Sequence, residues 1–198
     1  MKLSFLAAAL LALLFAGCGP KQFTKGDYDD PNRVELLDDK FNEADMQQMA
    51  ATIVDAMVNC PDIKGAKTAP TVALSKVVNR TEEHIDTDSL TDMIRTNLIK
   101  TRKVKFIDTK AREDIDKEYD YGAGGKVSKE TAKKGGSQIG VDYLFGGALA
   151  TNIQQVANDK FIYYKLTMNL TNTTTSVIDC SEEKEVRKKF RKRSTGLF

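Results

Sequence analysis

The single histidine is the first residue to test for chemistry, because a catalytic triad or a histidine-containing metal site would have to be built around it. His84 lies in the stretch NRTEEHIDT, beside Glu82, Glu83, Asp86 and Asp88. These neighbours are polar and no cysteine is near in the sequence. We therefore interpret His84 as a solvated loop residue, with a metal ligand or general base as the alternative.

Two other patterns carry residue types that could do chemistry. The glycine-rich stretch YGAGGKV, residues 121–127, has the composition of a phosphate-binding loop. Its spacing differs from that motif, and Val127 stands where a serine or threonine would bind magnesium. Carboxylates are numerous, but their spacing singles out no pair of the kind that glycosidases use. The sequence thus predicts a connecting loop here, no cofactor, no metal site and no enzymatic activity.

Cys60 and Cys180 are far apart in the sequence, which does not give the distance between them in the fold. In an oxidising compartment two such cysteines can pair. Two buried free thiols are the favoured interpretation, and a Cys60–Cys180 disulfide is the alternative.

Cys18 has a different context, because it closes an apolar N-terminal run. Lys2 provides a positive start, residues 3–16 carry no charge, and small residues precede the cysteine. These are the marks of a secretory signal peptide, and the run is shorter than the roughly 20 apolar residues of a transmembrane helix. The stretch FAGC resembles the bacterial lipobox, with Phe15 where leucine is commoner. We expect cleavage before Cys18 and its acylation by several chains, which anchor firmly because each buried methylene contributes about 0.8 kcal/mol.

The predicted domain organisation follows from this cleavage. Residues 1–17 form the signal peptide, and residues 18–40 form the lipidated N-terminus with a short, polar, flexible tether. Gly19, rather than aspartate, follows the cysteine, which favours sorting to the periplasmic face of the outer membrane. At about 3.3 Å per residue, a tether of about 22 residues spans at most about 70 Å.

The charge of the chain is nearly balanced, with 30 Lys and Arg against 28 Asp and Glu and a net charge of +2. Such a chain has no overall field to attract nucleic acid, which we exclude as a partner. Charge is concentrated in RKKFRKR, residues 187–193, where a basic C-terminal tail begins. We interpret this run as a solvated edge strand and tail, with an anionic surface as its target in the alternative.

Helices are expected in four places. Asn42 can cap the first helix, whose apolar residues recur at helical spacing until Pro61. The second follows the NRTEEHIDT loop. Asp108 can cap a third helix, and a fourth is expected from Ser128 to about Gly140.

Strands alternate with these helices and then follow them. In residues 161–171 apolar and polar side chains alternate, so one face of the sheet is expected to be wet, which is typical of antiparallel pairing. The order predicts one α+β domain over residues 41–198, with about four helices packed on an antiparallel-rich sheet of about five strands. The expected strands cover residues 71–78, 103–108, 143–156, 161–171 and 177–190.

Residues 77–108, VVNRTEEHIDTDSLTDMIRTNLIKTRKVKFID, resemble the outer-membrane lipoprotein activators of penicillin-binding proteins, the LpoB type. The stretches GVDYL at 140–144, YYKLT at 163–167 and EKEVRK at 183–188 also match that family. The resemblance covers most of the chain from about Gly26. It implies a domain similar to the N-terminal domain of TolB. It also implies a non-catalytic, outer-membrane-tethered regulator that binds a bifunctional peptidoglycan synthase and raises its activity.

The chain departs from the family pattern in three features. Cys180 stands where a tryptophan is expected, and Ser176 replaces an expected turn glycine, which would cost some conformational energy. The tether is also shorter than the proline-rich linker of relatives, so its reach leaves little margin for a partner at the inner membrane.

The resemblance also implies a contact surface around the helix before the GVDY segment. The partner-binding candidates there are Lys129, Lys133 and Lys134, and an ordinary solvated helix face is the alternative.

Two other functions compete with the activator. A curli-pore-like assembly or secretion lipoprotein resembles this fold, but it needs extra membrane-spanning strands of about 9–11 residues, for which this sequence has no spare segment. An enzyme of envelope metabolism would need a recognisable site, which the sequence does not show.

Overall fold

The computed structural model describes residues 26–31 and 33–192. Residues up to Arg33 form one unit, whose described side chains are solvent-exposed, and the chain from Val34 forms the folded domain. Cys18 and the predicted signal peptide lie outside the described residues, so cleavage and lipidation stay predictions. None of the helices in the described ranges combines the length and the apolar character that crossing a membrane requires.

The described residues form four helices and five strands. Their bounds are α2 Glu43–Asn59, α3 Pro61–Lys64, β1 Thr71–Arg80, α4 Thr87–Thr101, β2 Lys105–Phe106, α5 Arg112–Ala123, β3 Tyr143–Val156, β4 Asp159–Asn172 and β5 Ile178–Arg191.

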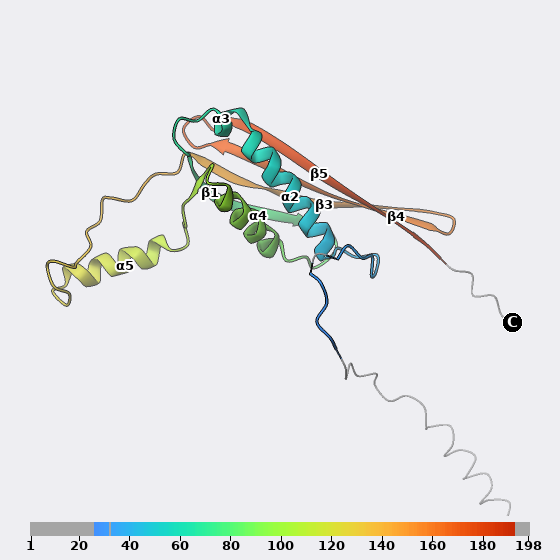
Figure 1. Cartoon of the computed structure of the whole chain (residues 1–198), viewed down its shortest axis with the longest axis horizontal. Helices are drawn as coiled ribbons and strands as arrows, with labels where there is room; N and C mark the ends of the chain where they lie inside the picture. The colour runs from blue at the N-terminus through green and yellow to red at the C-terminus, as the bar shows by residue number, and fades with distance from the viewer. Residues whose placement is uncertain (1–25, 32, 193–198) are drawn as a thin grey trace, which may run out of the picture. The chain divides into compact units, whose positions relative to one another are not determined.

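One mixed sheet organises the domain, in the strand order β2-β1-β3-β4-β5. Strand β1 runs parallel to both β2 and β3, whereas β3, β4 and β5 form an antiparallel meander. Helix α2 packs on β5 and on α4, and α4 packs on β1, so both long helices cover the same face of the sheet (Figure 1). The α+β prediction is confirmed, and the parallel pairs of β1 show that the sheet is mixed.

Helix α2 begins where its local sequence predicts. The Asn42 side chain accepts a hydrogen bond from the backbone N–H of Asp45 at 3.1 Å, and Asp45 accepts one from the backbone N–H of Asn42 at 2.9 Å. This capping box satisfies two N–H groups that have no partner within the helix. The apolar stripe of α2 is buried, with Met49 and Ile53 fully enclosed. The predicted first helix is therefore confirmed.

Strand β4 has the alternating pattern that its sequence predicts. The side chains of Ile162, Tyr164, Leu166, Met168 and Leu170 are buried under the helices. Their neighbours in the strand point to the opposite side of the sheet, where they are exposed or half-buried. One face of the meander is thus covered by helices and the other face is open to solvent.

The prediction of a helix from Ser128 to about Gly140 is wrong. This segment makes a single turn, in which Ala132 N donates to Ser128 O at 2.9 Å, and it then continues without regular structure. It lacks an apolar stripe that could pack on a core, and Gly136 has a φ of +92°, which a right-handed helix does not contain. The fourth helix is instead α3, a short turn of helix after Pro61 that buries Ile63.

The third predicted helix exists as α5, but it does not pack on the sheet. No residue of α5 is buried. Asp108 accepts hydrogen bonds from Lys110 N and Ala111 N at 3.0 and 3.1 Å, so it shapes the turn before the helix. The expectation of four helices on the sheet is therefore wrong for α5, because its sequence is too polar to supply a core face.

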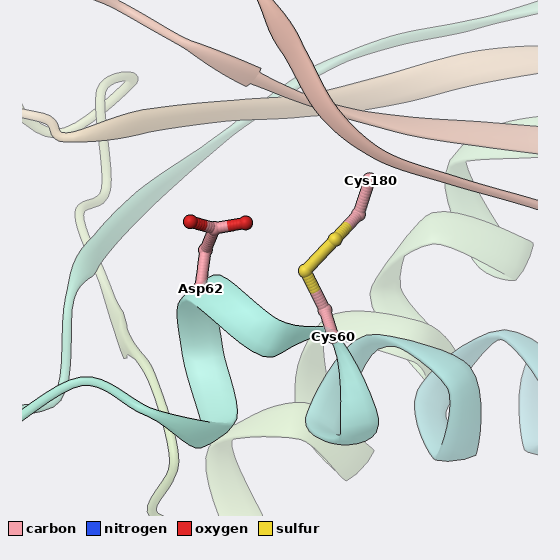
Figure 2. A group of neighbouring side chains, drawn as sticks. All are labelled: Cys60, Asp62 and Cys180. Carbon is pink, nitrogen blue, oxygen red and sulfur yellow. A yellow bond between two sulfur atoms is a disulfide. The ribbon is translucent and has the colours of Figure 1, made fainter.

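The two cysteines of the domain form a disulfide, which corrects the favoured expectation of free thiols. Cys60 lies directly after α2 and Cys180 lies in β5, with their Cα atoms 6.3 Å apart (Figure 2). The packing of α2 on β5 brings them together across 120 residues of sequence. Cys180, which stands in place of the expected tryptophan, thus holds the first helix to the last strand.

The turn between β4 and β5 requires a left-handed residue at its end. Ser176 has a φ of 61°, and its N–H donates to Asn172 O at 2.9 Å. This conformation costs a non-glycine residue about 1–2 kcal/mol. A glycine avoids that cost, but it loses more backbone entropy on folding, so the net gain is smaller. We expect Ser176→Gly to stabilise the domain by about 0.5 kcal/mol, measured by urea titration. The exposed Ser137, which has no positive φ, provides the control, and a Ser176→Gly variant no more stable than Ser137→Gly would contradict the prediction.

Candidate functional site

The three candidate lysines lie on a projecting arm, which we define as α5 together with residues 124–140. Lys129, Lys133 and Lys134 are exposed, and none of them makes an ion pair among the described residues. They stand close together in the returning segment of the arm, not on a helix as expected. Their loop position leaves them accessible, so they stay partner-binding candidates.

Few contacts hold the returning segment against α5. Gln138 Nε2 donates to Asp116 Oδ1 at 3.4 Å, and Arg112 Nη2 donates to the carbonyl of Ile139 at the same distance. The Tyr119 ring also lies against the backbone at Gly135. The arm is thus stabilised by contacts within itself, and it carries an acidic helix beside a basic return. The acidic residues of α5 are Glu113, Asp114, Asp116, Glu118 and Asp120, and the lysines of the return are Lys126, Lys129, Lys133 and Lys134.

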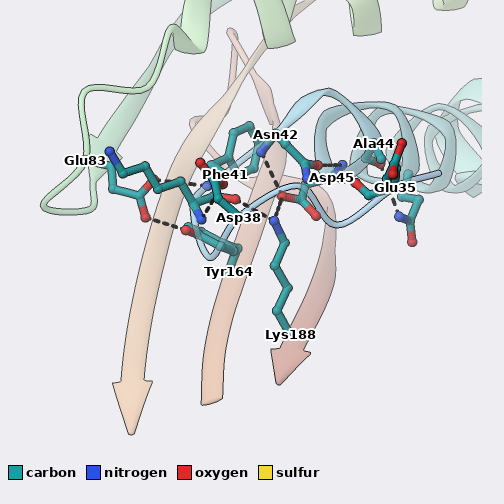
Figure 3. Close-up of polar contacts among 11 residues, drawn as sticks. Glu35, Asp38, Phe41, Asn42, Ala44, Asp45, Glu83, Tyr164 and Lys188 are labelled. Atoms are coloured by element: carbon teal, nitrogen blue, oxygen red, sulfur yellow. Dashed lines mark hydrogen bonds and ion pairs between the residues drawn. The ribbon is translucent and has the colours of Figure 1, made fainter. Parts of the chain in front are cut away.

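A second polar cluster, the tether junction, lies where the N-terminal segment enters the domain (Figure 3). Its centre is an ion pair between Lys188 and Asp45, 2.5 Å long, whose side chains are 1% and 2% exposed. The Lys188 ammonium also donates to the backbone carbonyl of Lys40 at 2.6 Å. The Asp45 carboxylate also accepts the hydrogen bond from Asn42 N in the capping box of α2, so one carboxylate joins the helix start to β5.

The other half of the tether junction surrounds Glu83. Its carboxylate accepts hydrogen bonds from Phe41 N at 3.0 Å and from the hydroxyl of Tyr164. The Phe41 and Tyr164 rings meet edge to face with centroids 5.3 Å apart. Burial and the hydrogen bond to Glu83 raise the pKa of Tyr164, which keeps the phenol protonated as a donor.

These contacts attach the N-terminal segment before α2 begins. Lys160 Nζ lies 2.6 Å from Asp39 Oδ2, and this hydrogen bond lowers the pKa of Asp39. The Lys40 carbonyl then accepts from Lys188 of β5, and Phe41 N donates to Glu83 in the loop before α4. The ion pair of Asp39 thus binds the N-terminal segment to the domain, and Asp39 lies inside the range that was predicted as tether.

Sequence reasoning missed the tether junction because it treated RKKFRKR as a solvated run. The alternation of strand residues was the available signal. Val186, Lys188 and Phe190 are two residues apart, so in a strand they share a face, and that face packs under α2. Arg187 and Lys189 lie on the opposite face of β5 and are exposed. The interpretation of the basic run as solvated is therefore confirmed for that face only.

Asp159 neutralises part of the exposed positive charge of β5. Its carboxylate pairs with Arg191 at 2.6 Å and with Lys189 at 2.9 Å. Hydrogen bonds from these two cations, with Arg191 the stronger influence, hold the pKa of Asp159 well below its usual range.

This low pKa predicts a pH dependence of stability. A depressed carboxyl pKa stabilises the fold above the unfolded value of about 3.9, and the contribution is lost as the pH falls through the folded value. We expect Asp159→Asn to lower the unfolding temperature at pH 7, with the gap to the parent closing below about pH 4. Thermal unfolding followed between pH 2 and 7 checks this, and a gap that is constant over this range would contradict it.

His84, the first sequence candidate for chemistry, is exposed in the loop before α4, as its interpretation as a solvated residue predicts.

The structure adds a group that the sequence did not suggest. Asp62 lies beside Cys60 and Cys180, the one group of at least three potential metal ligands within the described residues (Figure 2). Cysteines bind metal as thiolates, and here the two sulfurs are bonded to each other, so this group cannot hold a metal in the oxidised protein.

Comparison with known proteins identifies a family whose model matches this chain. A family model described as peptidoglycan-synthase activator LpoB matches residues 45–186. No curated protein matches the chain. Among solved structures, the LpoB C-terminal domain of Salmonella enterica is 17% identical, with a TM-score of 0.46 over 72% of this chain and 98% of that chain. The Escherichia coli domain is 16% identical, with the same TM-score and coverage. Lipoprotein GNA1162 of Neisseria meningitidis is 10% identical, with a TM-score of 0.40 over 64% and 88% of the two chains.

Proposed function

Because the chain belongs to the LpoB family of peptidoglycan-synthase activators, we propose that it is an outer-membrane lipoprotein that binds a bifunctional penicillin-binding protein and raises its synthase activity. The family match carries this proposal, since it runs from the first turn of α2 into β5 and so includes strands β1 to β4 and the first part of β5. The match favours the activator over the curli-pore-like alternative. The similarity to the TolB domain stays a prediction.

In this proposal the protein acts by contact and not by catalysis. The anchor is the acylated Cys18, which holds the protein to the outer membrane while the domain reaches toward the synthase. Residues 18–38 precede the Asp39–Lys160 ion pair, and at about 3.3 Å per residue these 21 or so residues span at most about 69 Å. The domain must supply the remaining reach, and a projecting arm would extend it.

The arm is our proposed contact surface. Its three exposed lysines carry positive charge without an ion-pair partner in the described domain, and they lie on an irregular segment that can adjust to a partner. Opposite charges across an interface speed association and select the partner. We therefore expect an acidic docking surface on the synthase.

The test is a binding and activity assay with the mature chain, residues 18–198, made soluble by Cys18→Ser. The immobilised chain should capture a bifunctional synthase from the same organism, and adding it to that synthase should raise the rate of glycan polymerisation. Capture without stimulation would make the protein a scaffold. If it binds none of the organism's synthases, the proposed function is wrong.

Charge reversal on the arm tests the contact surface. We expect Lys133→Glu/Lys134→Glu to weaken synthase binding about tenfold, about 1.4 kcal/mol, because two attractive charges become repulsive. Biosensor titration measures the affinity. The matched control is Lys100→Glu/Lys103→Glu, which reverses two exposed lysines at the end of α4. Equal affinities of the two double variants would remove the arm as the contact surface.

A further inference from the structure

The open face of the meander, on the side away from α2 and α4, carries a repeated arrangement of side chains. We call this side of β3, β4 and β5 the far face. In the strand register, residues directly opposite each other share a face, and two neighbouring rows across the far face have the same composition. Each row runs from a β3 amide to a β4 aromatic ring and a β5 cation. The rows are Asn152, Tyr163 and Arg187, and Gln154, Phe161 and Lys189.

The aromatic rings hold the central cation in place. The Arg187 guanidinium lies 4.9 Å from the Phe161 ring centroid and 5.1 Å from that of Tyr163. Lys189 lies 5.2 Å from the Phe161 ring. Attraction between a cation and a ring face restricts the long side chain, so Arg187 is preorganised over the sheet.

Arg187 differs from the other far-face cations because it has no carboxylate partner in the described domain. Lys189 pairs with Asp159 at 2.9 Å, and Lys165 pairs with Glu183 at 3.4 Å. Arg187 is exposed, and its guanidinium offers two parallel donors that fit a carboxylate.

The remaining groups of the rows define what else the ligand must offer. Asn152 and Gln154 are exposed amides, which can both donate to and accept from hydroxyl or acetamido groups. The half-buried rings provide apolar surface beside them. The two rows are about 7 Å apart along the strand, so a chain of repeating units could engage both.

We propose that the far face binds an anionic amino-sugar glycan, with Arg187 holding a carboxylate and the two amides binding the sugars. The occupant to which we commit is a peptidoglycan strand, whose amino sugars carry lactyl groups and peptides with free carboxylates. The choice of this polymer rests on the proposed function, which places the domain beside the cell wall. The contact would hold the activator on the wall while its arm engages the synthase.

Co-sedimentation with purified, insoluble peptidoglycan sacculi tests the site, using the soluble mature chain that carries Cys18→Ser. We expect the chain to sediment with sacculi and to stay in solution with chitin, a neutral amino-sugar polymer. Arg187→Ala and Asn152→Ala/Gln154→Ala should each reduce the bound fraction at least fivefold. Lys165→Ala removes a far-face cation that is already paired, and it should sediment like the parent. Circular dichroism should show the same fold for all variants.

Three results would overturn the proposal: a parent chain that does not sediment, equal sedimentation of Arg187→Ala and the parent, or equal binding to chitin. If Arg187→Ala still sediments but no longer activates the synthase, the far face is a protein interface and the glycan site is wrong. The sedimentation assay contains no synthase, so failure here leaves the proposed activator function standing, and failure to bind a synthase leaves this assay unaffected.

Discussion

Replacing Lys188 by methionine is expected to lower the free energy of unfolding by about 3–5 kcal/mol, because it leaves the carboxylate of Asp45 buried without its counter-ion. Both side chains are almost fully enclosed, so water cannot replace the lost ammonium. The carbonyl of Lys40 loses a donor in the same substitution. Methionine fills most of the space of the lysine stem, so the expected loss comes from the unpaired charge and not from a cavity.

Urea titration followed by circular dichroism measures this effect. The matched control is Lys189→Met at the next residue, whose side chain is half exposed on the far face. This substitution should lower the free energy of unfolding by no more than about 1 kcal/mol. In the double variant Lys188→Met/Asp45→Asn, the amide oxygen can still accept the cap hydrogen bond without a net charge, so part of the stability should return. A Lys188→Met variant as stable as the Lys189→Met control would show that the buried pair contributes little.

Removing the disulfide is expected to have an effect of similar size. The bond closes a loop of 120 residues, and for loops of this length the restriction of the unfolded chain contributes up to about 5 kcal/mol. We expect the Cys60→Ala/Cys180→Ala variant to lose about 3–5 kcal/mol of unfolding free energy. The loss should appear mainly as a lower midpoint in urea.

Reduction provides an independent check of the same bond. The parent chain, unfolded in urea with an excess of dithiothreitol, should lose nearly as much stability as the double variant. The double variant itself should show the same midpoint with and without dithiothreitol. An unchanged midpoint of the parent under reducing conditions, with full reduction verified by thiol titration, would contradict the prediction.

The two predictions concern opposite ends of one contact. Asp45 at the start of α2 binds Lys188 late in β5, and Cys60 after the end of α2 binds Cys180 early in β5. The two α2 positions are about 22 Å apart at 1.5 Å per residue, and the two β5 positions are about 26 Å apart at 3.3 Å per residue. The helix and the strand therefore match in length and run in opposite directions. This match lets one ion pair and one covalent bond hold α2 along β5.

Local sequence patterns predicted the elements of this pair. Three signals are local: the capping residue Asn42, the apolar stripe of α2 and the two-residue alternation of β4. Each lies within a single helix or strand, so the order of residues along the chain reveals it directly. The same reasoning failed for residues 128–140, where a helix was expected to start at Ser128. Without a core to pack on and with Gly136 in a left-handed conformation, that segment has nothing to stabilise a helix.

The sequence by itself determined the α+β class and the resemblance to a family of synthase activators, because each depends on neighbouring residues, and the lipobox at Cys18 stays a prediction of the same kind. Tertiary structure alone decided which distant side chains meet. Whether Cys60 is a thiol or half of a disulfide depends on how β5 lies along α2. Whether Lys188 is a solvated charge or a buried partner of Asp45 depends on the same packing. The two-residue alternation of side chains in a strand places Lys188 on the same face as Val186 and Phe190. Only the packing of α2 on β5 makes that face part of the interior.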